Sequence, residues 1–456
     1  MTQSRFDSVV SALRALTDDV SSFLPIRTAR TLLSRSVQRP APPALRIGQH
    51  EAALPIVQGG MGVGISLSGL ASAVANAGGI GVIAANGIGL LEQDYYRDGR
   101  AANLRAFRRE IRTAREKTNG LIGANIMVAV NDFHELLDVA IEERVDVVFM
   151  GAGLPIKGLP VDRMRSAGVA AVPIVSSVRA VDMIFRMWNK IYKDVPDAVV
   201  FEGPLAGGHL GFSAEQIDDP EYQLEAIVPQ IVEALVPHEE QAGRRIPVIA
   251  GGGVFTGEDM QRVLDLGAAG VQMGTRFVAT DECDADQAFK DAFVSATAED
   301  IGLIKSPVGM PGRAIRNQFI RDAEEGKRPA FRCAWQCLSS CKADDARYCI
   351  SIALNNARLG RLRQGFVFAG SNAARVTAIQ PVADLIAELR DGYVAAVQRI
   401  VGGRVGALVE RIDALRRQYA AKRAADAAAA AEIRDQIAAR LAEAWSLVTA
   451  RTDAVR

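Results

Sequence analysis

The chain has 456 residues, enough for two or three domains or for one large barrel with added segments. Its 53 basic and 53 acidic residues cancel, which argues against a general nucleic-acid-binding protein, because such proteins usually carry a basic surplus. The 49% hydrophobic and 23% charged residues are typical of a globular protein. We see no apolar run long enough for a membrane span, no leader peptide and too few cysteines for a secreted disulfide scaffold, so we expect a cytoplasmic protein.

Residues 1–45 are predicted to form a helical extension with a linker. Two amphipathic patterns, over 6–24 and 26–37, end at a proline-rich stretch around Pro40, Pro42 and Pro43. Proline breaks helices and favours extended chain, so we place the start of the main body at residue 46.

Between residues 54 and 277, short apolar runs alternate with longer amphipathic segments. The runs are eight in number, at 55–58, 81–85, 121–127, 145–150, 171–176, 198–201, 247–250 and 270–273. Continuous apolar strands between helices are typical of a parallel sheet covered by helices. Eight such units in roughly 230 residues approach the size of a TIM barrel. We therefore predict an α/β fold, a TIM (β/α)8 barrel over residues 46–330.

A doubly wound dinucleotide-binding fold is the alternative. Gly79, Gly81 and Ala84 match the spacing of its glycine-rich turn. These residues lie within the second predicted strand, however, and no helix is expected to begin there. We therefore reject this alternative.

Three further segments follow the predicted strands. Residues 278–330 are expected to hold the last barrel helix and an irregular Pro/Gly segment, SPVGMPGRAIRN. Residues 331–380 form a Cys-rich segment, and residues 381–456 are predicted to be helical, with many alanines. The tail is expected to be either an exposed helix or an arm for packing or homodimerisation.

Glycine-rich loops follow the last two predicted strands. These loops contain Gly251, Gly252 and Gly253 after the seventh strand and Gly274 and Thr275 after the eighth. Glycine lets the backbone approach a ligand closely, and amides at a helix N-terminus favour an anion. Because the loops after strands 7 and 8 are the usual phosphate site of a TIM barrel, we predict that they hold a phosphorylated ligand.

Polar side chains at other strand ends could bind a planar ring across the barrel mouth. Gln58, Asn125 and Glu202 lie at the ends of the first, third and sixth strands or within them. A phosphate at one side and a heteroaromatic ring over the centre fit FMN better than a sugar phosphate.

His209 is the histidine with the strongest functional context. It ends a glycine-rich loop after the sixth strand, whereas His50, His134 and His238 lie in linker or helical segments. Imidazole titrates near neutral pH and suits proton transfer. We expect His209 to act in catalysis or to contact the substrate.

Four of the five cysteines lie close together in the sequence. They are spaced C-x3-C-x3-C-x7-C, at Cys333, Cys337, Cys341 and Cys349. Four thiolates suit an iron–sulfur cluster or a structural zinc ion, and the spacing slightly favours iron–sulfur. The alternative is a helix in which these cysteines pack as small apolar residues.

Five segments together resemble the nitronate monooxygenase (2-nitropropane dioxygenase-like) family of FMN-dependent TIM barrels. They are PIVQGGMGVGIS, GANIMV, EGPLAGGHLGF, IPVIAGGGVFTGEDM and GVQMGTRF. Related FMN-dependent enoyl-ACP reductases share most of them, and they have Glu at the position of Glu202, where nitronate monooxygenases commonly have Gln.

The resemblance implies roles for individual residues. His209 matches the family's active-site histidine. The residues implied to contact FMN are Gln58, Gly59, Gly60, Met61, Asn125, Glu202, Gly207, Gly252, Gly253, Gln272, Gly274 and Thr275.

The resemblance also implies an activity on a small-molecule substrate. The first expectation is oxidation of alkyl nitronates with O2 to carbonyl compounds and nitrite. The alternative is NAD(P)H-dependent reduction of an enoyl thioester or quinone. A third expectation is a flavin-binding scaffold whose tail and Cys-rich segment mediate assembly.

Overall fold

A computed structural model describes residues 41–327, 331–339 and 341–423, together with 432, 435, 436, 439 and 440. Residues 1–40 of the predicted helical extension lie outside the described residues. Most of the predicted helical tail after residue 423 also lies outside them. Contacts divide the chain into one unit of residues 43–389 and another of residues 1–42 and 390–456. The fold described below is that of residues 43–389.

A parallel sheet of eight strands forms the centre of this unit. Its order is β3-β11-β10-β8-β7-β6-β5-β4. The strands are β3 (Ile56–Gln58), β4 (Gly81–Ala84), β5 (Ile122–Met127), β6 (Val147–Gly151), β7 (Ala170–Val175), β8 (Val199–Glu202), β10 (Val248–Gly251) and β11 (Gly270–Met273).

The sheet closes on itself through its two outer strands. Val57 of β3 forms a parallel bridge with Ile80, which directly precedes β4. The Gln58 N–H donates to the Ile80 carbonyl at 3.0 Å, and the Ile80 N–H donates to the Ile56 carbonyl at 2.9 Å. The predicted TIM barrel is therefore confirmed, and Gly81 and Ala84 lie in a barrel strand and not in a nucleotide-binding turn.

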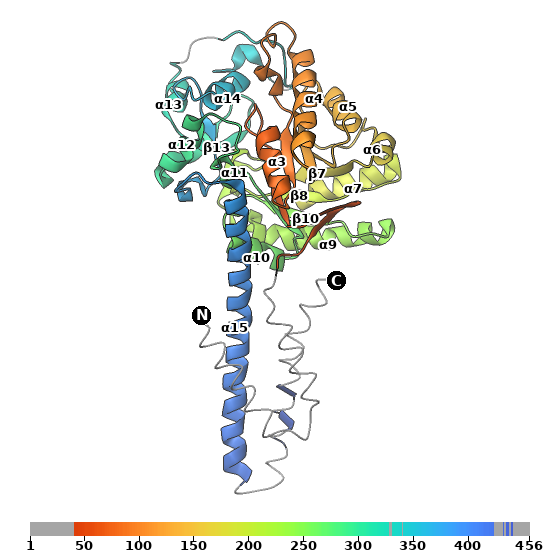
Figure 1. Cartoon of the computed structure of the whole chain (residues 1–456), viewed down its shortest axis with the longest axis vertical. Helices are drawn as coiled ribbons and strands as arrows, with labels where there is room; N and C mark the ends of the chain where they lie inside the picture. The colour runs from red at the N-terminus through yellow and green to blue at the C-terminus, as the bar shows by residue number, and fades with distance from the viewer. Residues whose placement is uncertain are drawn as a thin grey trace. The chain divides into compact units, whose positions relative to one another are not determined.

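Helices follow the strands around the outside of the barrel, as Figure 1 shows for α4 to α7. Their buried faces are apolar: α4, for example, buries Ala102, Ala106, Phe107 and Ile111. The helices between strands are α3 (Ser68–Asn76), α4 (Gly99–Lys117), α5 (Phe133–Glu142), α6 (Val161–Ala167), α7 (Val178–Tyr192), α8 (Ala214–Ile217), α9 (Leu224–Ala242) and α10 (Gly257–Asp265).

A hairpin covers the amino ends of the barrel strands. Its strands are β1 (Leu45–Ile47) and β2 (His50–Ala52), and its apolar side chains pack against Val57, Val82 and Phe149 inside the barrel. Gln49 and His50 both hydrogen-bond to the Gly168 carbonyl, two residues before β7 begins. With the amino end covered in this way, the carboxyl ends of the strands remain as the end where TIM barrels place their active sites.

A second, smaller sheet lies over the carboxyl ends of the strands. It joins β12 (Ile301–Lys305), β13 (Pro311–Ile315) and β14 (Val367–Phe368), and β9 (Gly208–His209) pairs with β13. The segment SPVGMPGRAIRN was expected to be irregular, but five of its residues form β13. Pairing with three other strands, two of them distant in sequence, stabilises this strand, and local pattern could not reveal that.

The remaining elements follow β11 and complete the described chain. They are α11 (Thr275–Val278), α12 (Gln287–Ser295), α13 (Gln318–Glu324), α14 (Ile350–Arg358) and α15 (Val382–Arg423), with short 3-10 turns between some of them. Within the described ranges, no helix is both long enough and apolar enough to cross a membrane.

Candidate functional site

The glycine loop after β10 is packed too closely for side chains. Gly252 and Gly253 have φ of +91° and +98°, a region that favours glycine. A Cβ on Gly252 would lie 2.7 Å from the Gly203 carbonyl oxygen, and one on Gly253 would lie 3.0 Å from the Leu205 side chain. This loop therefore presents backbone without side chains at the carboxyl end of β10, next to Gly274 and Thr275 after β11.

Helix N-termini contribute less to the predicted phosphate site than the sequence led us to expect. The helix after Gly274, α11, has only four residues, and α10 begins at Gly257, four positions after Gly253. The dipole of so short a helix is small, and the α10 terminus is separated from the glycines by an intervening loop. Any anion held here is bound chiefly by glycine backbone.

A loop from the C-terminal part of the unit completes this side of the mouth. The Gly370 N–H donates to Thr275 Oγ1 at 3.0 Å, and Asn372 Nδ2 donates to the Gly253 carbonyl at 2.8 Å. A Cβ on Gly207 would lie 2.6 Å from the Gly370 nitrogen. Residues 370–372 therefore join the loops after β8, β10 and β11, and sequence analysis did not identify them.

The loop after β3 is held in place by the Gln58 side chain. Gln58 is fully buried; its Nε2 donates to Ser66 Oγ at 2.9 Å and its Oε1 accepts from the Val82 N–H at 2.9 Å. A third bond runs from Nε2 to the Gly59 carbonyl. Three bonds within the barrel wall engage this amide, so its side chain positions the loop while the backbone of Gly59 to Met61 borders the mouth.

Asn125 of β5 lies beside that loop. A Cβ on Gly60 would lie 2.3 Å from the Asn125 Cβ, so only glycine fits opposite this side chain. Gln272 of β11 is in register with Gly251 and with Val57 of β3. Asn125 and Gln272 thus lie on different strands of the barrel, at the same carboxyl end as the glycine loops.

Two polar groups at the carboxyl ends of the strands have environments that favour a polar ligand, one on Asn86 and one on Glu202. Asn86 follows β4, and its Oδ1 accepts from the Met127 N–H at 3.1 Å, but its buried Nδ2 has no hydrogen-bond partner. Desolvation raises the pKa of the Glu202 carboxyl to about 7. Buried polar groups are normally paired, so the unpaired Asn86 amide and the desolvated Glu202 carboxyl fit a polar ring above the strands, and together with the glycine loops they fit FMN.

The loop from Glu202 to His209 is fixed by Arg313 of β13. Arg313 is buried, and its Nη1 donates to the carbonyls of Pro204 at 2.6 Å and Ala206 at 2.8 Å. Burial lowers the pKa of this guanidinium. Arg313 therefore connects the small sheet to the loop that carries the candidate catalytic histidine.

His209 lies in β9, paired with Gly312 of β13. Its Nε2 lies 2.7 Å from Ser306 Oγ, and its ring packs edge-on against Phe368 with centroids 5.0 Å apart. Burial lowers the pKa of His209 to about 4. The imidazole is therefore uncharged at neutral pH and held in one orientation, which makes it a weak base but suits it to bind and orient a substrate by hydrogen bonding.

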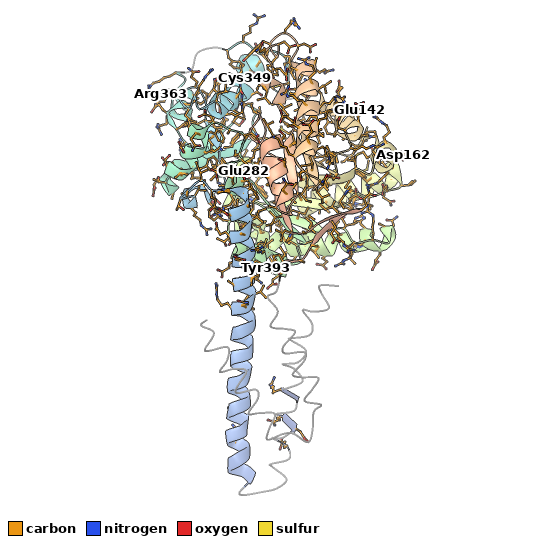
Figure 2. All side chains as sticks on the ribbon, viewed as in Figure 1. Glu142, Asp162, Glu282, Cys349, Arg363 and Tyr393 are labelled. Atoms are coloured by element: carbon orange, nitrogen blue, oxygen red, sulfur yellow. The ribbon has the colours of Figure 1, made fainter. Side chains whose placement is uncertain are left out.

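The Cys-rich segment lies over the end of β5, and its described residues from 331 to 349 form no α-helix, only a short 3-10 turn at Ala343–Asp345. The Asn131 N–H donates to the Cys337 carbonyl at 3.1 Å, the Ser339 N–H donates to the Ala129 carbonyl at 3.0 Å, and Leu338 bridges Val130. The alternative of a helix with cysteines at every fourth position is wrong, since pairing with the loop after β5 holds this segment extended. Figure 2 labels Cys349, directly before α14.

The four cysteines receive no support as a metal centre. All are free, and no three His, Cys, Asp or Glu side chains in the described ranges are placed to hold a metal ion. Burial raises the pKa of Cys337 to about 11 and also raises the pKa of Cys341 and Cys349. In the absence of a metal ion, these three thiols are therefore neutral and pack as small, weakly polar groups.

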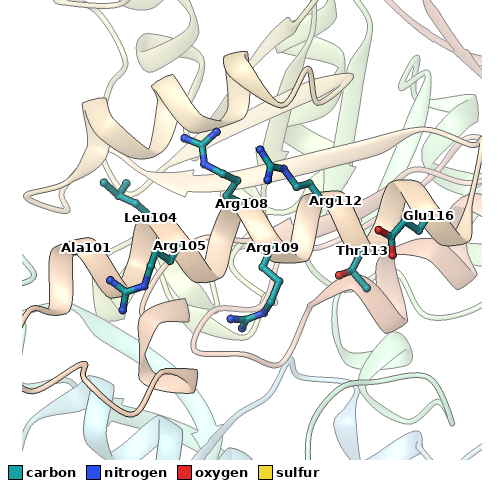
Figure 3. A pocket seen from close by; sticks show the side chains of 8 residues that line it. All are labelled: Ala101, Leu104, Arg105, Arg108, Arg109, Arg112, Thr113 and Glu116. Carbon is teal, nitrogen blue, oxygen red and sulfur yellow. The ribbon is translucent and has the colours of Figure 1, made fainter.

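A hollow of about 610 Å³ runs along the outer face of α4 (Figure 3). Its arginines are paired with acids: Arg105 with Asp94 at 2.5 Å and Arg112 with Glu143 at 2.8 Å. Arg108 pairs with Glu142 and Glu143, and Arg109 with Glu92. This surface is a network of solvated ion pairs on the outside of the barrel, so we do not consider it a candidate active site.

The match to known proteins agrees with this geometry. Residues 44–392 match the nitronate monooxygenase family. A carboxyl-CoA dehydrogenase from Mycobacterium tuberculosis, whose acyl group is a hydroxylated methyl-oxo-octahydroindene, is 29% identical over 274 residues, 60% of this chain. The chain spans 66% of the length of that relative.

Two further similarities cover larger parts of the compared proteins. A probable nitronate monooxygenase from Staphylococcus aureus is 27% identical over 304 residues, 61% of this chain and 80% of the relative. The structure of FabK from Thermotoga maritima aligns with a TM-score of 0.59 and 29% identity, over 78% of this chain and 96% of FabK. With a family match across most of its length and a closed barrel with the expected loops, the chain belongs to the nitronate monooxygenase family of FMN-dependent oxidoreductases.

Proposed function

We propose that this protein is an FMN-dependent nitronate monooxygenase, which oxidises alkyl nitronates with O2 to carbonyl compounds and nitrite. The residues that would hold FMN are the glycines at 252, 253 and 274 with Thr275 on the phosphate side, and Gly60, Asn125 and Glu202 on the ring side. Bound FMN supplies the electron-accepting chemistry that none of the amino-acid side chains can supply.

The observation that carries this proposal is the uncharged, oriented imidazole of His209. A base whose pKa is lowered to about 4 is poorly suited to remove a proton from a neutral nitroalkane at pH 7. A nitronate has already lost that proton, so His209 needs only to orient the anion. Ser306 holds the ring in place through the 2.7 Å contact with Nε2.

Glu202 is compatible with an anionic substrate for a related reason. Because its pKa is raised to about 7, a large fraction of this carboxyl is protonated at neutral pH. A protonated carboxyl can donate a hydrogen bond to an anion, whereas a carboxylate would repel it.

The test is O2 uptake with an alkyl nitronate in the absence of NAD(P)H, with nitrite measured in parallel. We expect equal O2 consumption and nitrite formation, and a fall in kcat/KM of about 10- to 100-fold for His209→Ala, the scale of a lost hydrogen bond to a charged group. His134→Ala, an exposed histidine of α5, is the matched control. Unchanged turnover in His209→Ala with full FMN content would contradict the role of His209.

A second candidate function is NAD(P)H-dependent reduction of an enoyl thioester or quinone. It is favoured by Glu202, the residue of the enoyl-ACP reductases at this position, and by the relative named as acting on a CoA thioester. Loss of the flavin absorbance on anaerobic addition of NAD(P)H, without any nitronate-dependent O2 uptake, would favour this candidate.

The proposal includes a cytoplasmic location and a homodimer. Cell fractionation and light scattering of the purified protein test these two parts independently of the activity.

A further inference from the structure

A cavity of about 560 Å³ lies between the Cys-rich segment, the chain after β4 and the residues that follow β12. Leu90 and Tyr95 contribute from the chain after β4, and Leu338 contributes from the segment that pairs with the loop after β5. The volume is within the range of small-molecule sites, and the position is the carboxyl end of the barrel strands, where the active sites of this fold lie.

The inner wall of this cavity adjoins the candidate catalytic histidine. Pro307 and Val308, which line the cavity, directly follow Ser306, whose hydroxyl contacts His209 at 2.7 Å. Val308 also packs with Phe368, the ring that lies against His209, in one apolar cluster. A molecule bound in the cavity would therefore extend away from the atoms around His209.

The lining is largely apolar, and its charges lie in exposed positions. Ile350 and Ile352 of α14 line it, with Trp335 and Phe331 from the Cys-rich segment. The charged lining residues, Lys342, Asp344 and Asp345, are all exposed.

The four thiols of the Cys-rich segment also line this cavity. Burial raises the pKa of three of them, Cys337, Cys341 and Cys349, so these three are neutral and behave as small apolar groups. Together with the aliphatic and aromatic side chains, these thiols give the cavity wall its apolar part.

We propose that the cavity binds the hydrocarbon part of the substrate, an alkyl chain or ring system, while the reacting head group lies at His209. This inference rests on the proposed function and specifies its substrate class: nitronates with long or bulky apolar groups in preference to small ones. It also gives the Cys-rich segment a role as a wall of the substrate site.

The kinetic test compares alkyl nitronates of increasing chain length, from ethyl to hexyl. Each buried methylene is expected to raise kcat/KM by about two- to fourfold, so hexyl nitronate exceeds ethyl nitronate by at least about tenfold. Ile352→Trp fills the cavity and should reduce the ratio of hexyl to ethyl kcat/KM to about one. Ile191→Trp, at an exposed position of α7, should retain the wild-type ratio.

A binding test with the neutral fluorophore N-phenyl-1-naphthylamine does not depend on turnover. Its fluorescence should rise on addition to the FMN-loaded wild-type protein, and hexyl nitronate should displace it at concentrations where ethyl nitronate does not. Ile352→Trp should abolish the rise, and Ile191→Trp should leave it.

The outcomes of the two tests separate the inference from the proposed function. A hexyl-to-ethyl ratio near one in the wild type, the same ratio in Ile352→Trp as in the wild type, or probe fluorescence that hexyl nitronate cannot displace would overturn the inference. If no nitronate is oxidised at any chain length, the proposed function fails, and probe displacement by the hexyl compound still decides whether the cavity takes hydrocarbon.

Discussion

The two sides of the barrel mouth are built differently. On the side of β8, β10 and β11, glycine backbone approaches glycine backbone, and a Cβ on Gly252 would lie 2.7 Å from the Gly203 carbonyl oxygen. On the side of β4 and β5, side chains of the Cys-rich segment surround a cavity of about 560 Å³. The glycine side has no room for added side-chain atoms, whereas the side with the Cys-rich segment has space for a bound group.

This difference corresponds to two kinds of ligand. A cofactor phosphate is recognised by close backbone amides, and any added atom disturbs that recognition. A hydrocarbon group is recognised by apolar area, which tolerates changes in individual side chains. We therefore expect substitutions on the glycine side to have large effects, and substitutions in the Cys-rich segment that keep the size of the side chain to have small ones.

The largest effect is expected for Gly252→Ala. The new Cβ would clash with the Gly203 carbonyl at a φ of +91°, so the loop must move. Backbone strain and overpacking each cost about 1–3 kcal/mol, which predicts a loss of FMN affinity of about 100-fold. Titration of the FMN-free protein with FMN, monitored by flavin fluorescence, measures this loss of affinity.

Gly243→Ala provides the matched control for this prediction. Gly243 also has a positive φ, +65°, but a Cβ there meets nothing within 4 Å. It should lower stability by about 1 kcal/mol and leave FMN affinity unchanged. If the two variants bind FMN equally well, close backbone packing is not what holds the cofactor.

Glu202→Gln should change how stability depends on pH in the FMN-free protein. The pKa of Glu202 is about 7 in the folded chain against an ordinary value of 4.5. Since the folded pKa is the higher one, the stabilisation is present below pH 4.5 and is lost as the pH rises through about 7, by at most about 3 kcal/mol.

Urea denaturation of wild type and Glu202→Gln at about pH 5 and about pH 9 measures this loss. The free energy of unfolding of the wild type relative to the variant should be smaller at the higher pH. His209 is present in both proteins, so its own titration cancels in this difference. A difference that does not change with pH would show that Glu202 is not desolvated.

Arg313→Lys should have an intermediate effect. Both bonds to the Pro204 and Ala206 carbonyls come from Nη1, which is one bond farther from the backbone than a lysine Nζ, so a lysine would leave at least one acceptor unpaired, at about 1–3 kcal/mol. We expect a lower denaturation midpoint and reduced kcat/KM, because the loop to His209 loosens. Arg321→Lys, on the exposed surface of α13, is the control and should change neither.

The smallest effect is expected for Cys341→Ser. As a partly buried thiol without a metal it should alter stability by no more than about 0.5 kcal/mol, and metal analysis should find no iron or zinc in stoichiometric amount. Loss of a metal ligand would instead remove folding energy outright. A large fall in melting temperature together with loss of bound metal would therefore show that Cys341 is a metal ligand.

The barrel could be predicted from sequence because its strands are short continuous apolar runs. All eight predicted runs overlap the observed strands; the run at 81–85, for example, became β4 at Gly81–Ala84. Once the strands were predicted, the glycine loops could also be located, because they directly follow the strand ends.

What the sequence did not reveal depends on contacts between distant segments. Asn372 and Ser306 lie 119 and 97 positions from the residues that they contact, Gly253 and His209. β13 is stabilised by pairing partners on either side of it in the sequence, and the Cys-rich segment is held extended by the loop after β5. No local pattern encodes such pairs, so the role of Arg313 and the cavity beside His209 became visible only in the structure.

The most direct test of the whole account is one absorption spectrum, recorded without air on the FMN-loaded protein. We predict that the yellow flavin absorbance persists when NAD(P)H is added alone and decreases when hexyl nitronate is added. Bleaching by NAD(P)H with no response to the nitronate would contradict the proposed activity.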